Sequence, residues 1–341
     1  MKDLVIGDCH FGIKSNSTRW LEQMLEFFNT QITDTIKSEN PDRVIFLGDL
    51  FDVRYSTNTL VGCSVKRMIR TLVCNFPNVM FYFIAGNHDF YSPLEEFIDD
   101  NVYMMVFGKE FEEIHQNVKF VVNETYIDNN TLMMPWYSTE NKNVFLSTLE
   151  DNNDCNLIYC HSDLQRWDSD MLLAATGRMV IAGHIHYPWI DKQHNLYNVG
   201  ACLALTFNDV NSNRYVYVVD NSKFVKKVEN ITTPKFKRWY NDEIFNLSTS
   251  DFNNCFCEFY ISKNLINKAK YIEAIKKLKQ DNVGVPIRVQ TVDEDFSIAN
   301  NNIDFNKDIN KYIDDNIPDY LHDKYLQVKE NISKNSKEVS I

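Results

Sequence analysis

The feature that most constrains this chain is a pattern repeated five times, in which a short apolar run ends in side chains able to bind metal ions. The runs are LVIGDCH (4–10), RVIFLGDLFD (43–52), VMFYFIAGNHD (79–89), NLIYCHSD (156–163) and MVIAGHIH (179–186). Short, nearly continuous apolar runs are typical of strands buried on both faces. One such strand end would be weak evidence of a metal site, but these five hold five of the eight histidines.

Helical patterns lie between the apolar runs. Residues 18–38 and 59–75 carry apolar side chains spaced three or four apart, which predicts amphipathic helices. Ser92-Pro93-Leu94-Glu95 has the residue order of a helix start, with a serine cap, proline at the first position and glutamate at the third. Alternating strands and helices predict an α/β layered fold. Ligands of such sheets bind beyond the carboxyl ends of the strands, so the five clusters should converge on one rim.

Composition limits the class of protein. The chain has 341 residues, 44% hydrophobic and 24% charged, which fits one large or two medium globular domains. No apolar run approaches the roughly 20 residues that span a bilayer, and no signal peptide is evident. Eight scattered cysteines indicate reduced thiols and a cytoplasmic location, in the host cytoplasm if the chain is phage-encoded. The net charge of −12 argues against coating nucleic acid by bulk electrostatics, but bound metals could supply local positive charge.

The five motifs, taken together and in order, resemble those of the calcineurin-like metallophosphoesterases. They are Asp8-x-His10, Gly48-Asp49, Gly86-Asn87-His88-Asp89, His161 and Gly183-His184-x-His186, within about the first 190 residues. The resemblance implies a β-sandwich flanked by helices, with two metal ions at the rim of the sheets. GDLFD with GNHD is further similar to the SbcD-type nuclease subunits of recombination and break-repair complexes, including those of tailed phages.

The same resemblance implies a ligand set. One metal would take Asp8, His10, Asp49 and His186, and the other would take Asp49, Asn87, His161 and His184. Asp49 would therefore bridge the two ions. Oxygen and imidazole ligands without thiolate suit Mn²⁺, Fe or Zn²⁺, and the resemblance favours Mn²⁺. Two such ions activate water and neutralise charge on a phosphoryl group.

Three further residues have roles to be tested. The resemblance gives His88 the role of a catalytic, non-ligand histidine that contacts the phosphate and protonates the leaving oxygen. Asp52 would orient His88 as its partner, or it is a helix cap or turn carboxylate. Arg54 is a candidate phosphate contact, with a structural salt bridge as the alternative.

The second half of the chain predicts a different organisation. We expect a nuclease domain over 1–230, a small α+β capping domain that guides DNA over 235–295, and a helical tail over 300–341. Strands at 254–262 and 285–292 flank a lysine-rich helix at 263–280. Lys270, Lys276 and Lys277 are candidate DNA contacts, or they form an ordinary solvated helix face.

The tail carries Phe305, Ile309 and Ile313 four residues apart, which is typical of an amphipathic helix that docks on a partner. In the resembled complexes the C-terminal helical segment binds an SMC-like ATPase. The alternative is that these helices fold back on their own domain. A homodimer is expected from the resemblance alone.

These observations predict a metal-dependent DNA nuclease subunit, acting as an exonuclease on duplex ends, as an endonuclease, for example on hairpins, or as both. One alternative is a phosphoesterase of the same fold for a small phosphodiester or a phosphoprotein. Protein phosphatases of the superfamily usually carry Asp-Arg-Gly where this chain has Asp52-Val53-Arg54, which counts against a phosphoprotein. A second alternative is a non-catalytic scaffold, which would not need intact ligands at every motif.

Overall fold

The computed structural model describes residues 1–54, 56, 58–90, 102–137, 142–210, 212–252, 255–282 and 287–292. The predicted helix start at Ser92 and the predicted tail at 300–341 lie outside these residues. The chain divides into two compact units. Unit 1 comprises Met1–Arg238, Ser248–Glu258 and Asp281–Arg288, and unit 2 comprises Trp239–Leu247, Phe259–Gln280 and Val289–Ile341.

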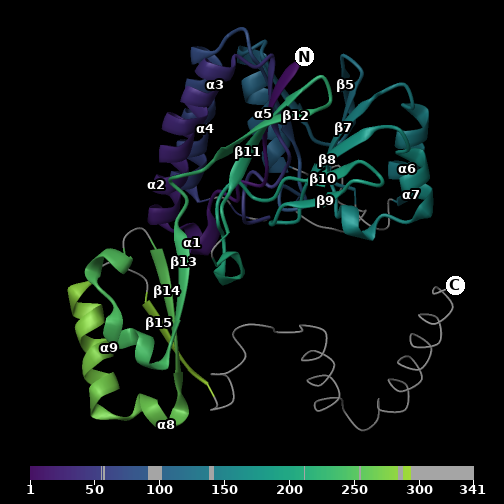
Figure 1. Cartoon of the computed structure of the whole chain (residues 1–341). Coiled ribbons are helices and arrows are strands. Elements are labelled where there is room, and N and C mark those ends of the chain that lie inside the picture. Colours follow the sequence, from purple (N-terminus) through teal and green to yellow (C-terminus); the bar gives the residue numbers. More distant parts are fainter. Residues whose placement is uncertain are drawn as a thin grey trace, which may run out of the picture. The chain divides into compact units, whose positions relative to one another are not determined.

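The first sheet carries three of the five predicted strands. Its order is β12 (Phe224–Glu229), β11 (Tyr215–Asp220), β1 (Lys2–Ile6), β2 (Arg43–Phe46), β3 (Met80–Ile84) and β4 (Val118–Val121). Strands β1 to β4 run parallel, whereas β11 and β12 pair antiparallel. The outer face is covered by α2 (Thr18–Phe27), a π-helical turn (Phe28–Ile32), α3 (Thr33–Glu39), α4 (Thr59–Asn75) and α5 (Val102–Ile114). The helices predicted at 18–38 and 59–75 are therefore present (Figure 1).

The second sheet carries the other two predicted strands. Its order is β5 (Tyr126–Asp128), β6 (Thr131–Met134), β7 (Leu157–His161), β8 (Met179–Gly183), β10 (Leu196–Asn198) and β9 (Trp189–Asp191). Strands β6, β7, β8 and β10 run parallel. Helices α6 (Lys142–Asp151) and α7 (Ser169–Ala174) cover its outer face. Shorter turns lie at Ile13–Asn16 (α1), Leu164–Arg166, Phe207–Asp209, Asn241–Asn246 and Thr249–Phe252.

The two sheets pack face to face. Val5 and Ile45 of the first sheet meet Tyr159 and Ile181 of the second in one apolar layer, and all four side chains are fully buried. Alternate residues of the same strands point outward into the helical layers, so each strand is apolar on both faces. This arrangement confirms the predicted β-sandwich flanked by helices. It also explains why the five runs look alike although they belong to two sheets.

A buried ion pair joins the two sheets at the amino ends of their parallel strands. Arg43 at the start of β2 donates two hydrogen bonds to the Asp3 carboxylate on β1, at 2.7 and 2.8 Å. From the second sheet, Tyr159 donates its hydroxyl to Asp3 (2.8 Å), and Thr131 accepts from Arg43 (3.0 Å). We call this cluster the Arg43 lock. Its charges are paired and hydrogen-bonded, as buried charges must be.

A third sheet has the order β13 (Lys235–Tyr240), β14 (Cys255–Ser262) and β15 (Ile287–Val292). Helices α8 (Lys263–Ile266) and α9 (Ala269–Asp281) connect β14 to β15, so the predicted strand–helix–strand order is present. Strands β12 and β13 both form within the basic segment 222–240. The predicted domain limits remain predictions. Among the described residues, no helix is long and apolar enough to cross a membrane.

Candidate metal centre

The carboxyl ends of five parallel strands bring the seven predicted ligands together. Within each sheet these strands run in the same direction, so their following loops share one rim. The ligands by strand are Asp8 and His10 after β1, Asp49 after β2, Asn87 after β3, His161 at the end of β7, and His184 and His186 after β8. Two sheets therefore contribute to one site.

Asp49 lies at the centre of this group. Its Oδ2 is 3.5 Å from His10 Nε2, and its Oδ1 is 3.4 Å from His161 Nε2. The side chain is 2% exposed, so both oxygens are withdrawn from bulk solvent. The two carboxylate oxygens thus face two different sets of ligands, which is the arrangement that a bridging carboxylate requires.

Each oxygen faces one compact set of donor atoms. On one side, His10 Nε2 lies 3.0 Å from His186 Nε2, and His186 Nε2 lies 3.9 Å from Asp8 Oδ2. The donor atoms of Asp8, His10, Asp49 and His186 all lie within 4.8 Å of one another. On the other side, Asn87 Oδ1 is 2.9 Å from both His161 Nε2 and His184 Nδ1. Both sets mix oxygen and imidazole nitrogen, which suits divalent cations.

Hydrogen bonds from outside the cluster fix the orientation of its ligands. His161 Nδ1 donates to the Leu47 carbonyl (2.7 Å), which leaves Nε2 as the nitrogen that faces the site. The His184 amide donates to both Asp8 oxygens at 3.1 Å. The amides of Cys9 and His10 donate to the Asp49 carbonyl at 3.1 and 2.8 Å. The loops after β1, β2 and β8 are therefore linked before any ion binds.

Glycines at the strand ends make room for these side chains. A Cβ on Gly86 would lie 2.2 Å from Asp49 Oδ1, and one on Gly183 would lie 2.4 Å from Asp8 Oδ1. No real Cβ approaches so closely. The Gly-Asn-His and Gly-His motifs thus form a cradle around the carboxylates, and the residues present fit a pair of divalent ions.

Three proposed ligands have the left-handed backbone conformation that L-residues rarely adopt. The φ angles are 51° for His10, 48° for Asp49 and 88° for His184. Such conformations persist only where the surrounding structure holds them, and they cluster at functional sites. Their coincidence at one rim is an independent indication that this rim is built for binding rather than for stability.

The charges of the cluster depend on one another. Burial raises the pKa of Asp49, but His161 and His10 more than offset this effect and hold it well below its usual range. Burial alone lowers the pKa of His161, yet the Asp49 carboxylate raises it to about 9. Burial and the neighbouring His161 lower the pKa of His184 to about 4. The cluster therefore holds an ionised carboxylate and a proton that a bound cation would displace.

His88 and Asp52 meet through the main chain. His88 Nδ1 lies 2.6 Å from the Asp52 carbonyl oxygen, which can only accept, so Nδ1 carries the hydrogen. The Asp52 carboxylate instead lies 3.3 Å from His10 Nδ1. The His88 amide donates to Asp49 Oδ1 at 2.8 Å. The structure thus places His88 beside the bridging carboxylate and gives Asp52 contacts to two histidines.

The residues predicted to contact phosphate or DNA, Arg54 and three lysines, differ in their exposure and in their partners. Arg54 is half-buried, and no ion pair is found for it among the described residues. Lys276 and Lys277 are exposed on α9. Lys270 is engaged within unit 2, where its Nζ lies 3.4 Å from Asp242 and 5.0 Å from the centre of the Tyr271 ring.

Two residues of the site were given no role by the sequence patterns. Asp89 is 5% exposed, and its carboxylate accepts from the amides of Gly86 (2.8 Å), Leu50 and Phe51 (both 3.2 Å). It thereby joins the loops after β2 and β3. Trp136 follows β6 and stacks on His184, with ring centres 4.8 Å apart. Asp89 ends the GNHD motif, which could have indicated its role, but nothing local indicated Trp136.

Comparisons with known proteins agree with this geometry. Residues 1–188, more than half of the chain, match the calcineurin-like phosphoesterase family. The chain belongs to this family. With its clustered ligands it is a metal-dependent hydrolase of phosphate esters.

The chain is also similar to one particular protein of known name. The chain is 23% identical to the SbcD subunit of nuclease SbcCD from Staphylococcus epidermidis over 253 residues, covering 64% of this chain and 66% of that protein. The chain therefore spans slightly less than two thirds of this relative's length. The likeness covers more of the chain than the family match alone.

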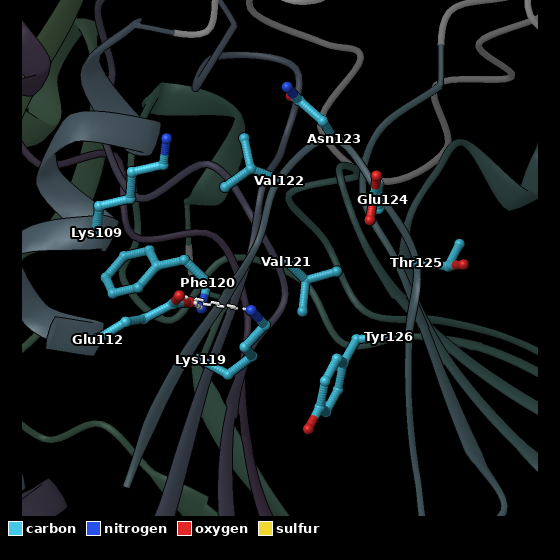
Figure 2. A pocket seen from close by; sticks show the side chains of 10 residues that line it. All are labelled: Lys109, Glu112, Lys119, Phe120, Val121, Val122, Asn123, Glu124, Thr125 and Tyr126. Carbon is cyan, nitrogen blue, oxygen red and sulfur yellow. Dashed lines mark hydrogen bonds and ion pairs between the residues drawn. The ribbon is translucent and has the colours of Figure 1, made fainter. Parts of the chain in front are cut away.

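A separate cavity of about 350 Å³ lies between α5 and the segment that links β4 to β5. Figure 2 shows Glu112 reaching Lys119, with Tyr126 on the other side of the strand. Glu112 accepts from the Phe120 amide at 2.6 Å and pairs with Lys119 at 3.4 Å. None of the predicted site residues lines this cavity, and the two contacts of Glu112 attach α5 to β4.

Proposed function

We propose that the chain is the nuclease subunit of a DNA recombination or repair complex and hydrolyses DNA phosphodiesters with two divalent ions, of which Mn²⁺ is favoured. The observation that carries the proposal is the position of Asp49, whose Oδ2 lies beside His10 and whose Oδ1 lies beside His161, one residue from each proposed ligand set. The likeness to a relative whose name is that of a nuclease subunit supports DNA as the substrate.

Two bound ions would activate a water molecule and neutralise charge on the phosphoryl oxygens. Asp8, His10, Asp49 and His186 would hold one ion, and Asp49, Asn87, His161 and His184 would hold the other. Because its Nδ1 hydrogen is directed to the Asp52 carbonyl, protonated His88 would present its Nε2 hydrogen to the leaving oxygen. A main-chain acceptor orients His88, so we expect Asp52→Asn to retain that orientation and to act mainly through His10.

The experiment is digestion of an end-labelled DNA duplex with Mn²⁺, comparing the wild-type protein with His88→Ser. The matched control is His194→Ser, because His194 bonds to Asp191 (2.7 Å) outside the metal centre. We expect degradation by the wild type and the control, and a loss of at least about 100-fold in His88→Ser, the usual contribution of acid–base catalysis. Equal degradation by all three would contradict the role of His88.

The same set of proteins separates the alternatives. Hydrolysis of a small aryl phosphodiester without DNA cleavage would indicate a different substrate. No hydrolysis in either assay, with metal bound to the protein, would indicate a non-catalytic scaffold.

Arg54 is proposed to contact a phosphate of the substrate. Lys276 and Lys277 are proposed to contact DNA as it approaches.

We propose that the segment 300–341 binds an SMC-like ATPase, since its apolar stripe is suited to docking. Co-purification of a large ATPase with the full chain, lost in Ile309→Asp and kept in the neighbouring Asp308→Asn, would support this partner. Sedimentation of the purified chain tests the proposed homodimer separately.

A further inference from the structure

A second cavity, of about 170 Å³, lies directly beside the metal centre. His184 forms part of its wall, and the other lining residues include Trp136, Tyr137, Phe145, Trp167 and Met171. Its size suits a single ring system, because a cavity of ~150 Å³ can hold one benzene molecule. The cavity therefore shares a wall with a proposed metal ligand and is too small for a folded partner.

The wall of the cavity is an ordered set of aromatic rings. Trp136 lies against His184 with an angle of 29° between the ring planes. Phe145 packs edge-on against both Tyr137 (5.6 Å) and Trp167 (5.4 Å). Trp167 is held further by a hydrogen bond from its Nε1 to Ser162 (2.9 Å). These contacts fix the rings in place, so a flat ligand would find preformed apolar surfaces.

The rim of the cavity is polar and nearly neutral. Arg166 pairs with Asp163 at 3.2 Å, and Lys142 pairs with Asp168. The Arg166 side chain is 80% exposed, so it can exchange its partner for a phosphate oxygen at low cost. The two carboxylates can accept from exocyclic amino groups. An aromatic wall with such a rim suits a ligand that combines a flat heterocycle with an anionic phosphate.

We propose that this cavity binds one nucleobase of the strand being cut, next to the scissile phosphate at the metal centre. The inference rests on the proposed function, because it assigns a subsite to a DNA substrate. Stacking on aromatic side chains accepts every base, so the subsite would hold a single unpaired nucleotide with little sequence preference. A duplex end would have to fray by one nucleotide to fill it.

The first test compares two single-stranded oligonucleotides, one intact and one with an abasic residue at a single position. Loss of a stacked base should slow cleavage of the bond next to the abasic residue by about 5- to 100-fold in the wild type. This ratio is measured within one enzyme, so it does not depend on how much protein is active or metal-loaded. Equal cleavage of both oligonucleotides would overturn the proposal.

The second test fills the cavity. Met171 lines it, whereas Leu173 on the same helix is 75% exposed and does not. We expect Met171→Trp to slow cleavage of intact DNA and to reduce the abasic discrimination to less than about twofold, and Leu173→Trp to behave as wild type. Tyr137→Ala, which removes part of the wall, should also reduce the discrimination and serves if Met171→Trp does not fold. Undiminished discrimination in these variants would contradict the assignment.

A binding measurement separates this inference from the proposed function. Thymidine 5′-monophosphate is titrated into the metal-free protein in EDTA, with tryptophan fluorescence as the readout, since Trp136 and Trp167 line the cavity. Saturable quenching in the wild type and in Leu173→Trp would show that the nucleotide binds. An affinity for the nucleotide at least tenfold lower in Met171→Trp would place it in the cavity, even if no DNA is cleaved. DNA cleavage without any such quenching leaves the proposed function standing and overturns the subsite.

Discussion

At the residue scale, the metal centre depends on backbone conformation as much as on ligand chemistry. His10, Asp49 and His184 have positive φ angles, and Gly86 and Gly183 leave the space that their neighbours' carboxylates occupy. Strain of this kind costs on the order of 1–3 kcal/mol per residue. The main-chain and carboxylate hydrogen bonds that link the loops offset this cost, and they hold the ligands before an ion arrives.

Gly86→Ala tests the space around the ligands. The added methyl group would meet the Asp49 side chain and backbone within 2.3 Å, so we expect loss of metal binding and of activity. Gly177→Ala is the control, because its Cβ would meet nothing within 4 Å and only its φ of 79° is unfavourable. The control should lose about 1 kcal/mol of stability and keep its activity. Metal content and thermal melting are measured on both variants, and full metal occupancy in Gly86→Ala would refute the steric argument.

Asp49→Asn tests the bridging carboxylate. Asparagine has the same shape and tolerates the left-handed conformation, so the fold should persist. A ligand at 100 times its dissociation constant stabilises the native state by about 2.7 kcal/mol, and we expect Mn²⁺ to raise the melting temperature of the wild type accordingly. In Asp49→Asn, Mn²⁺ should raise the melting temperature far less than in the wild type. Asp191→Asn, which alters a carboxylate outside the site, should retain it, and an unchanged response in Asp49→Asn would exclude Asp49 as a ligand.

At the scale of elements, the parallel strands have different tasks at their two ends. Their carboxyl ends hold the metal centre, and their amino ends hold the Arg43 lock between the sheets. The apolar layer between these ends contains Val5, Ile45 and Tyr159. Stability and chemistry are therefore separated along the same strands.

Arg43→Ala should destabilise the protein by about 3–5 kcal/mol, because it leaves the buried Asp3 carboxylate without its partner. Urea unfolding measures this change. Lys37→Ala removes an exposed ion pair with Asp34 and should change stability by less than about 0.5 kcal/mol. Activity of the folded Arg43→Ala protein should be unaffected, since the lock lies at the other end of the strands. A loss below about 1 kcal/mol would show that the lock is not a stabilising contact.

The sequence predicted the strands, and which side chains meet at their ends, better than it predicted the surroundings of those side chains. Each of the five runs is a strand, because burial on both faces leaves an apolar pattern that local inspection detects. Which runs share a sheet depends on long-range pairing, which no single run encodes. The Arg43 lock and the stacking of Trp136 on His184 also join distant segments, and neither residue stands in a distinctive motif.

Some misses have a local cause. Strands β12 (FVKKVE) and β13 (KFKRWY) lie in a basic segment without the strict alternation of apolar and charged residues that predicts a strand. The contact of Asp52 with His88 was expected from its carboxylate, but the backbone carbonyl faces the ring. The residue type at position 52 does not determine whether its carboxylate or its backbone carbonyl turns toward His88.

At the scale of the whole molecule, charge distribution sets how DNA could approach. The chain carries a net charge of −12, so bulk electrostatics repels a polyanion and attraction must be local. Lys276 and Lys277 are exposed on α9, whereas Lys270 is engaged with Asp242. The first two are therefore the better candidates for contact with phosphates.

The double change Lys276→Glu and Lys277→Glu should weaken DNA binding and reduce the dependence of affinity on salt by about two ion equivalents. Hydrolysis of a small aryl phosphodiester should be unchanged, because the metal centre is untouched. The control is Lys192→Glu with Lys223→Glu, which changes the net charge equally elsewhere in the chain. Equal weakening by both pairs would mean that only net charge matters.

The separation of the two strand ends has a consequence for native-state hydrogen exchange. The amides of Cys9 and His10 bond across the rim to the Asp49 carbonyl, whereas the β1 amides beside Asp3 lie next to the Arg43 lock. Amides at the rim should exchange through local opening that added Mn²⁺ slows. Those near Asp3 should exchange only through global unfolding and respond to Mn²⁺ only through the stability of the whole domain. One short stretch of chain would then report two distinct opening free energies.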